Sequence, residues 1–238
     1  SEEEILRRIA EEIKRLIDED LRLIEELVRK IKTVAKRDLE LIARLVEKIE
    51  EVIRRSIRVE EVVRELKKKL DEILKRVEDV VRESKKRLED VRRKVEEAVK
   101  KSKEEIERIL RRAEEGTDKK KIVEDLERVL KDHLDMNTEV VKDLKKILDD
   151  HLDANREVVK RLKEVLDDAV RVLRERIEDE EELKTAEKII EDIKKEIDDV
   201  HREVRRLLEE IKEDIDRVNE EVKKRLEDII EKIRRAAK

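Results

Sequence analysis

Apolar residues return along the first quarter of the chain at the spacing of an α-helix, and the whole pattern repeats every 18 residues. Three copies of one apolar stripe follow each other, beginning at Ile5, Leu23 and Leu41. Eighteen residues make five full turns at 3.6 residues per turn, so the apolar face returns without angular drift. The pattern predicts one long, nearly straight helix over about residues 2–55.

Two turn signals follow this first stripe. The apolar pattern changes phase near Ser56, which is a candidate N-cap for a second helix. Further on, Gly116 can take the left-handed conformation that ends a helix, and Thr117 or Asp118 can cap the next one. We therefore predict turns within about residues 56–60 and beside Gly116.

A third turn is predicted where Asp179 and Glu182 have the spacing of a capping box. The chain contains no proline and only one glycine, so few residues force a break elsewhere. The three turns divide the remaining chain into three further helices, over about residues 59–115, 118–177 and 180–237.

Long helices joined by a few residues must run antiparallel to their neighbours in the chain. Each apolar stripe covers about 120 to 160° of the helix surface, which is wide enough for a four-helix core. We expect an all-α fold, a single-chain up-down-up-down four-helix bundle that forms one domain over residues 1–238. Helical hairpins that assemble between chains, and domain-swapped forms of the bundle, are the alternatives.

The apolar stripes contain polar residues that themselves recur 18 residues apart. His133 and Asn137 lie at the centre of the third stripe and recur as His151 and Asn155. On a helical wheel the other polar pairs lie at the centre of the first and second stripes and at the edge of the fourth. These pairs are Asp20 and Asp38, Ser84 and Ser102, and His201 and Asn219.

The heights of these residues along an antiparallel bundle test whether they can meet. Two residues lie level when their numbers add to twice the number at the turn centre. The two Ser–His combinations of the second and third helices both add to 235, and the two combinations of the third and fourth helices both add to 356. Half of each sum falls at a predicted turn. The first helix matches to within about one helical turn.

We therefore predict two polar layers, both buried, with His201 and Asn219 at their edges. The first polar layer consists of Asp20, Ser102, His133, Asn137 and Asn219. The second polar layer consists of Asp38, Ser84, His151, Asn155 and His201. Buried polar groups are costly unless they are hydrogen-bonded, and a polar layer penalises every register that leaves it unpaired. We interpret all ten residues as structural hydrogen-bond networks that specify register and pairing.

Composition excludes several classes of function. The chain has 65 basic and 70 acidic residues, interspersed along the helices, and no aromatic residue that could stack on a base. We expect no nucleic-acid binding. No apolar run reaches the length of a membrane span, so we expect a soluble protein that stays in the cytoplasm when expressed in a cell. The chain has no cysteine and therefore no thiolate metal site.

The combination of 18-residue copies, Ile/Leu/Val stripes, Glu/Lys/Arg surfaces, short turns and Asp/Ser/His/Asn layers resembles computationally designed helical bundles with buried hydrogen-bond networks. The resemblance covers the whole chain. It implies a de novo structural scaffold with no natural biochemical function or location, no enzymatic activity and no cofactor. It also implies a monomer that requires no partner, with self-association as an alternative.

Other functions remain open as alternatives. The chain could be a designed assembly or binding component, homo- or hetero-oligomeric, that responds to pH through histidine; the sign of that pH dependence stays open. A metal- or haem-binding bundle could use Asp38, His151 and His201, but the two histidines are offset by about 6 Å in predicted height. We therefore assign no metal, cofactor or catalytic residue.

Overall fold

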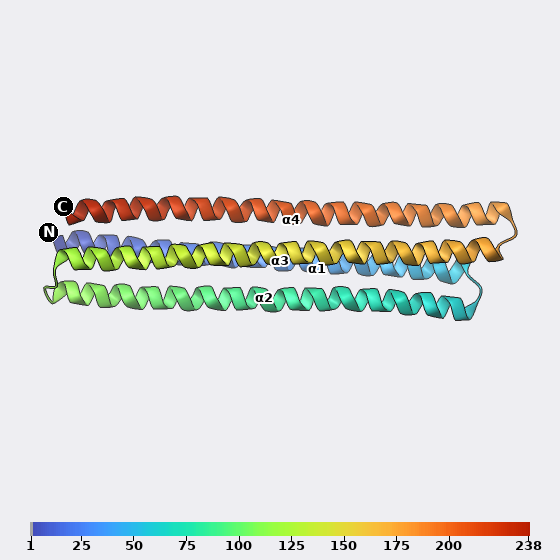
Figure 1. The fold of residues 1–238 in the computed structure, drawn as a ribbon, viewed down its shortest axis with the longest axis horizontal. Helices are drawn as coiled ribbons and strands as arrows, with labels where there is room; N and C mark the ends of the chain where they lie inside the picture. Colours follow the sequence, from blue (N-terminus) through green and yellow to red (C-terminus); the bar gives the residue numbers. More distant parts are fainter. Residues whose placement is uncertain (1) are drawn as a thin grey trace. The chain divides into compact units, whose positions relative to one another are not determined.

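A computed structural model describes residues 2–238, and over this range the chain forms α-helices and short turns with no strand (Figure 1). The prediction of an all-α fold with four long helices is confirmed, and each boundary lies within one residue of the predicted one. The helices are α1 (Glu2–Ser56), α2 (Glu60–Glu114), α3 (Lys119–Arg176) and α4 (Glu180–Ala237).

Charges at the helix ends complement the helix dipoles. The first turn of α1 contains Glu2 and Glu3, and its last turn contains Arg54 and Arg55. The other helices also end with arginines in the last turn. Acidic side chains near the positive N-terminus and basic ones near the negative C-terminus each stabilise an exposed helix by about 0.3–1 kcal/mol.

The turn between α2 and α3 forms as predicted around Gly116, which has a φ of +87°. The Thr117 N–H donates to the Arg112 carbonyl at 3.0 Å and closes the end of α2. Asp118 caps α3, because its Oδ1 accepts a hydrogen bond from the Lys120 N–H at 3.4 Å. The one glycine of the chain therefore lies where a left-handed backbone is needed.

The two other turns contain no glycine. Asp179 caps α4 as predicted, because its Oδ1 accepts from the Glu181 N–H at 3.0 Å. The proposed N-cap role of Ser56 is wrong: Ser56 ends α1, and α2 begins only at Glu60. The intervening turn is held instead by Ile57, whose side chain is buried in the core, so apolar burial replaces a side-chain cap.

The chain forms two compact units, each built from a segment of every helix. The first unit contains residues 1–30, 87–147 and 211–238, and the second contains residues 31–86 and 148–210. Both chain ends belong to the first unit. The description of residues 1–238 as one domain stays a prediction.

In the first unit, ion pairs show which helix segments are neighbours and that these neighbours run antiparallel. Pairs that join the segments around the unit are Lys14–Glu107 for α1 and α2, Arg112–Asp125 for α2 and α3, Arg234–Glu127 for α3 and α4, and Lys232–Glu12 for α1 and α4. Between them lies a core of fully buried aliphatic side chains, among them Ile13, Ile106, Leu126 and Leu226.

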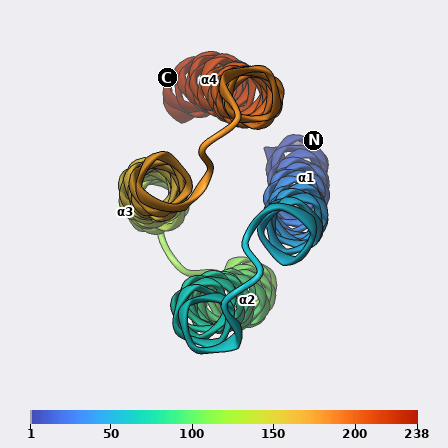
Figure 2. The ribbon, with the colours of Figure 1, turned by 90° about the vertical axis from the view of Figure 1, so that its right-hand side faces the viewer.

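The second unit has the same arrangement. Figure 2 looks onto its end, with α1 and α3 at opposite corners and α2 and α4 at the other two. The ion pairs Lys69–Asp168, Lys163–Asp198 and Lys48–Glu196 join neighbouring segments. Its core includes the fully buried Ile49, Leu70, Leu162 and Ile197.

Candidate functional site: two buried polar layers

The first polar layer lies in the first unit, and its central contact joins α1 to α3. His133 Nε2–H donates to Asp20 Oδ2 at 2.7 Å, and both side chains are fully buried. A second hydrogen bond joins α3 to α4, where Asn137 Nδ2 donates to Asn219 Oδ1 at 3.1 Å. Asn137 is buried, whereas Asn219 is partly buried, as expected for a residue at the edge of its stripe.

The second polar layer lies in the second unit and repeats the central contact. His151 Nε2–H donates to Asp38 Oδ2 at 2.9 Å, again between α1 and α3. These helices occupy opposite corners in Figure 2, so the bond crosses the core. Asn155 is buried beside this pair, and His201 of α4 is partly buried at the edge.

The neighbours of Asn155 determine the orientation of its amide. With the NH2 directed at Asp38, Nδ2 donates to Asp38 Oδ1 at 3.1 Å and to Oδ2 at 3.0 Å. The amide oxygen then accepts from His201 Nδ1–H at 3.0 Å. The opposite orientation would direct the amide oxygen at a carboxylate, so hydrogen bonding selects the first one. Hydrogen bonds thus connect His151, Asp38, Asn155 and His201 in series.

The two serines do not join their layers as expected. Ser84 is buried, but the prediction that Ser102 is buried is wrong, because its side chain is partly exposed. Over residues 2–238, neither hydroxyl hydrogen-bonds to the aspartate or histidine of its layer. A physical reason for the exposure of Ser102 lies one turn away: Ala98 precedes it by four residues and is too small to cover it, whereas Val80 precedes Ser84.

The diagonal Asp–His contact was not predicted, because heights were compared only between antiparallel neighbours. A signal was available in the sequence. Both Asp–His pairs have a separation of 113 residues, and parallel helices at opposite corners of a bundle keep a constant separation between level residues. The comparison of α1 with α3 would therefore have found both pairs.

Three buried polar atoms of the layers have no hydrogen-bond partner within the described chain. They are Asp20 Oδ1, His133 Nδ1 and His151 Nδ1. In contrast, both oxygens of Asp38 accept from Asn155. A buried polar atom without a partner costs about 1–3 kcal/mol, so the first polar layer leaves more of its hydrogen-bonding capacity unused at the carboxylate.

His201 is the histidine whose protonation the surroundings clearly disfavour. Burial lowers its pKa below the usual 6.5, and the positive charges of Arg156 and Arg205 lower it further. The carboxylates of Asp38 and Asp198 act in the opposite direction but are weaker. A neutral His201 suits its hydrogen bond, in which Nδ1–H donates to the Asn155 oxygen.

Neither a metal centre nor a membrane span emerges from the described residues. Over residues 2–238, no three His, Cys, Asp or Glu side chains are grouped so that they could hold a metal ion. Within the same range, no helix combines the length and apolar character needed to cross a membrane.

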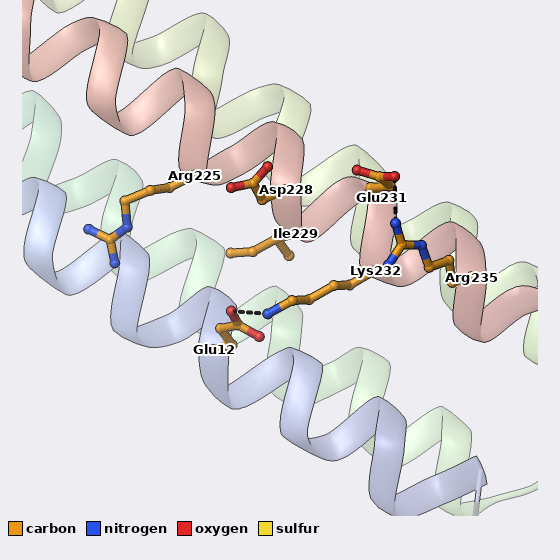
Figure 3. A pocket seen from close by; sticks show the side chains of 7 residues that line it. All are labelled: Glu12, Arg225, Asp228, Ile229, Glu231, Lys232 and Arg235. Carbon is orange, nitrogen blue, oxygen red and sulfur yellow. Dashed lines mark hydrogen bonds and ion pairs between the residues drawn. The ribbon is translucent and has the colours of Figure 1, made fainter.

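The surface depression between α1 and α4 of the first unit is lined almost entirely by charged side chains (Figure 3). Lys232 donates to Glu12 at 3.0 Å, and Arg235 donates to Glu231 at 2.7 Å. The dashed lines in Figure 3 mark these two contacts, which occupy the charged groups with each other. The depression therefore offers a ligand little that is not already paired.

No protein-family model, curated protein or solved structure matches this chain.

Proposed function

We propose that the chain is a designed structural scaffold, in which the two polar layers specify the register and pairing of the helices. The observation that supports this proposal is the repeated Asp–His contact. The same 113-residue separation recurs one 18-residue period later, between the same two helices and through the same atoms. Such a repetition fits a role that depends on position along the helices.

The energetic argument concerns alternative registers. If α1 moved along α3 by one helical turn, Asp20 and His133 would separate while still facing apolar side chains. Each buried group that loses its partner costs about 1–3 kcal/mol, and an ionised one costs more. An aliphatic stripe has no comparable penalty, because one Leu or Ile replaces another at each step.

Two layers exclude a register that one layer would permit. Because the apolar stripe repeats every 18 residues, a slip of one full period would restore apolar packing. It would bring Asp38 opposite His133, but it would leave Asp20 and His151 without partners. The layers also differ on α4, where Asn219 in one corresponds to His201 in the other, so each layer fits only its own segment of α4.

The proposal is tested by replacing both central pairs with leucine: Asp20→Leu, Asp38→Leu, His133→Leu and His151→Leu. We expect the variant to remain helical and at least as resistant to denaturant, because apolar replacement of a buried ion pair is often neutral or stabilising. We expect it to lose its single arrangement. Sedimentation should then give masses above the 28.7 kDa of one chain, and amide NMR resonances should broaden.

A matched control carries only Asp20→Leu and His133→Leu, so that the second polar layer is intact. It should keep a single mass, because one remaining layer still penalises most incorrect registers. If the fourfold leucine variant is as monodisperse and as well resolved by NMR as the unaltered chain, the layers do not specify pairing and the proposal fails. A doubled mass for the unaltered chain would instead favour assembly as its purpose.

A further inference from the structure

A groove lies between α2 and α3 of the first unit, immediately beside the first polar layer. Its volume is about 560 Å³, within the range typical of small-molecule sites. Ala98, Val129 and Met136 contribute apolar side chains to it, and Ser102 and His133 contribute polar ones. Charged residues line the rest, so the groove combines an apolar wall with a buried polar group.

The sequence copies explain part of the opening. Eighteen residues before Ala98 the chain has Val80, and eighteen residues after Val129 it has Ile147. At both positions the first unit therefore has the smaller side chain. Fewer carbon atoms stand between α2 and α3 near Ser102, which is consistent with the partial exposure of that serine.

His133 provides the polar group of the groove. Its Nε2 is committed to Asp20 across the core, whereas its Nδ1 is buried and has no partner. The two nitrogens lie on different sides of the imidazole ring, so Nδ1 cannot also face Asp20. Because His133 lines the groove, the side of the ring away from Asp20 is the side that a ligand there would meet.

We propose that this groove binds a small molecule with an apolar, ring-sized body and a hydroxyl group, such as a phenol or a cyclic alcohol. The hydroxyl would hydrogen-bond to His133 Nδ1 and the body would cover Ala98, Val129 and Met136. A hydroxyl fits because it can donate to an unprotonated Nδ1 or accept from a protonated one. The apolar wall favours such a molecule over water, which would leave that surface uncovered. This inference does not depend on the scaffold function proposed above.

The test is a titration of the full chain with phenol, followed by ¹⁵N NMR of the three histidine side chains. We expect a saturable shift of the His133 Nδ1 resonance, with the resonances of His151 and His201 unchanged. Benzene has the same ring without the hydroxyl and should bind at least about tenfold more weakly, the effect of one net hydrogen bond. Equal binding of the two probes, or a shift of His133 that never saturates, would overturn the proposal.

Two valine variants complete the test. Ala98→Val fills the groove with the side chain found one period earlier and should weaken phenol binding at least about tenfold, while the Asp20–His133 contact stays in place. Ala154→Val makes the same chemical change in the second unit and should leave the titration of His133 unaltered. Both variants are first checked for an unchanged amide NMR spectrum outside the substituted turn. Unaltered phenol affinity in a folded Ala98→Val variant would show that the groove is not the binding site.

Discussion

The two polar layers begin from the same residues on α1 and α3 but differ in how far their hydrogen bonds connect. In the second polar layer, Asp38 accepts from His151 and from Asn155, and Asn155 accepts in turn from His201. In the first, the carboxylate accepts only from His133, and the asparagine turns its NH2 toward Asn219 instead.

The α4 residue explains this difference. His201 presents an Nδ1–H donor, so Asn155 must direct its oxygen at α4 and its NH2 at the carboxylate. Asn219 can present an oxygen, so Asn137 can donate to it and leave Asp20 Oδ1 without a partner. One edge residue, partly exposed in both layers, thus decides whether the buried carboxylate is fully hydrogen-bonded.

The largest effect should come from replacing the aspartates with asparagine. In Asp38→Asn, the new NH2 meets either the His151 or the Asn155 donor, so a buried bond is lost at a cost of about 2–3 kcal/mol. In Asp20→Asn, the NH2 can take the place of the unpartnered Oδ1, and we expect a loss of about 1 kcal/mol. Guanidinium chloride unfolding measures both free energies. Equal losses would mean that the two carboxylates are equally well bonded.

Exchange of the α4 residues should interconvert the two layers. His201→Asn removes the donor that orients the Asn155 amide and should destabilise the protein by about 1 kcal/mol, the net value of one hydrogen bond. Asn219→His supplies that donor to the first polar layer and should stabilise it by a similar amount. The side-chain amide protons of Asn137 and Asn155, observed by NMR, report the orientation directly. An unshifted Asn137 amide in Asn219→His would contradict the explanation based on α4.

A smaller effect should appear on acidification, and only His201 should cause it among the α4 residues compared. Its folded-state pKa is lowered by burial and by Arg156 and Arg205, so the unfolded chain binds a proton more readily. Stability should therefore be complete above about pH 6.5, the unfolded value, and fall as the pH drops below it. Melting temperatures between about pH 4 and 8 measure this loss.

The control for the pH experiment is His201→Asn, in which the part of the slope due to this residue should disappear. The predicted pH responses of His133 and His151 would remain in that variant. If the slope is the same with and without His201, the lowered pKa has no consequence for folding.

The smallest effects are expected at the surface, where the two units should behave alike. Glu12 pairs with Lys232 in the first unit, and Glu196 pairs with Lys48 at 2.8 Å in the second. Exposed pairs of this kind contribute little because water screens them. Glu12→Gln and Glu196→Gln should each change the free energy of unfolding by less than about 0.5 kcal/mol. A larger change in one unit would indicate that its surface pairs, and not only its polar layer, set its stability.

Several elements were predictable because their cause is local. The bounds of the helices follow from stripes of 3.6-residue period, from Gly116 and from the caps at Asp118 and Asp179. The membership of His133 and His151 in buried stripes also follows from periodicity. The Ser56 cap was wrong because Ile57, a core residue, closes that turn through contacts with other helices.

The sequence by itself determined which face of each helix is apolar and at which heights polar residues interrupt it, since both depend only on the geometry of one helix and the length of its turns. Only the tertiary structure decided the partners. The diagonal Asp–His bonds, the orientation of Asn155 and the exposure of Ser102 each depend on side chains from two or three helices. A hydrogen bond is made or lost over about 0.5 Å, and no single-helix pattern specifies distances between helices that finely.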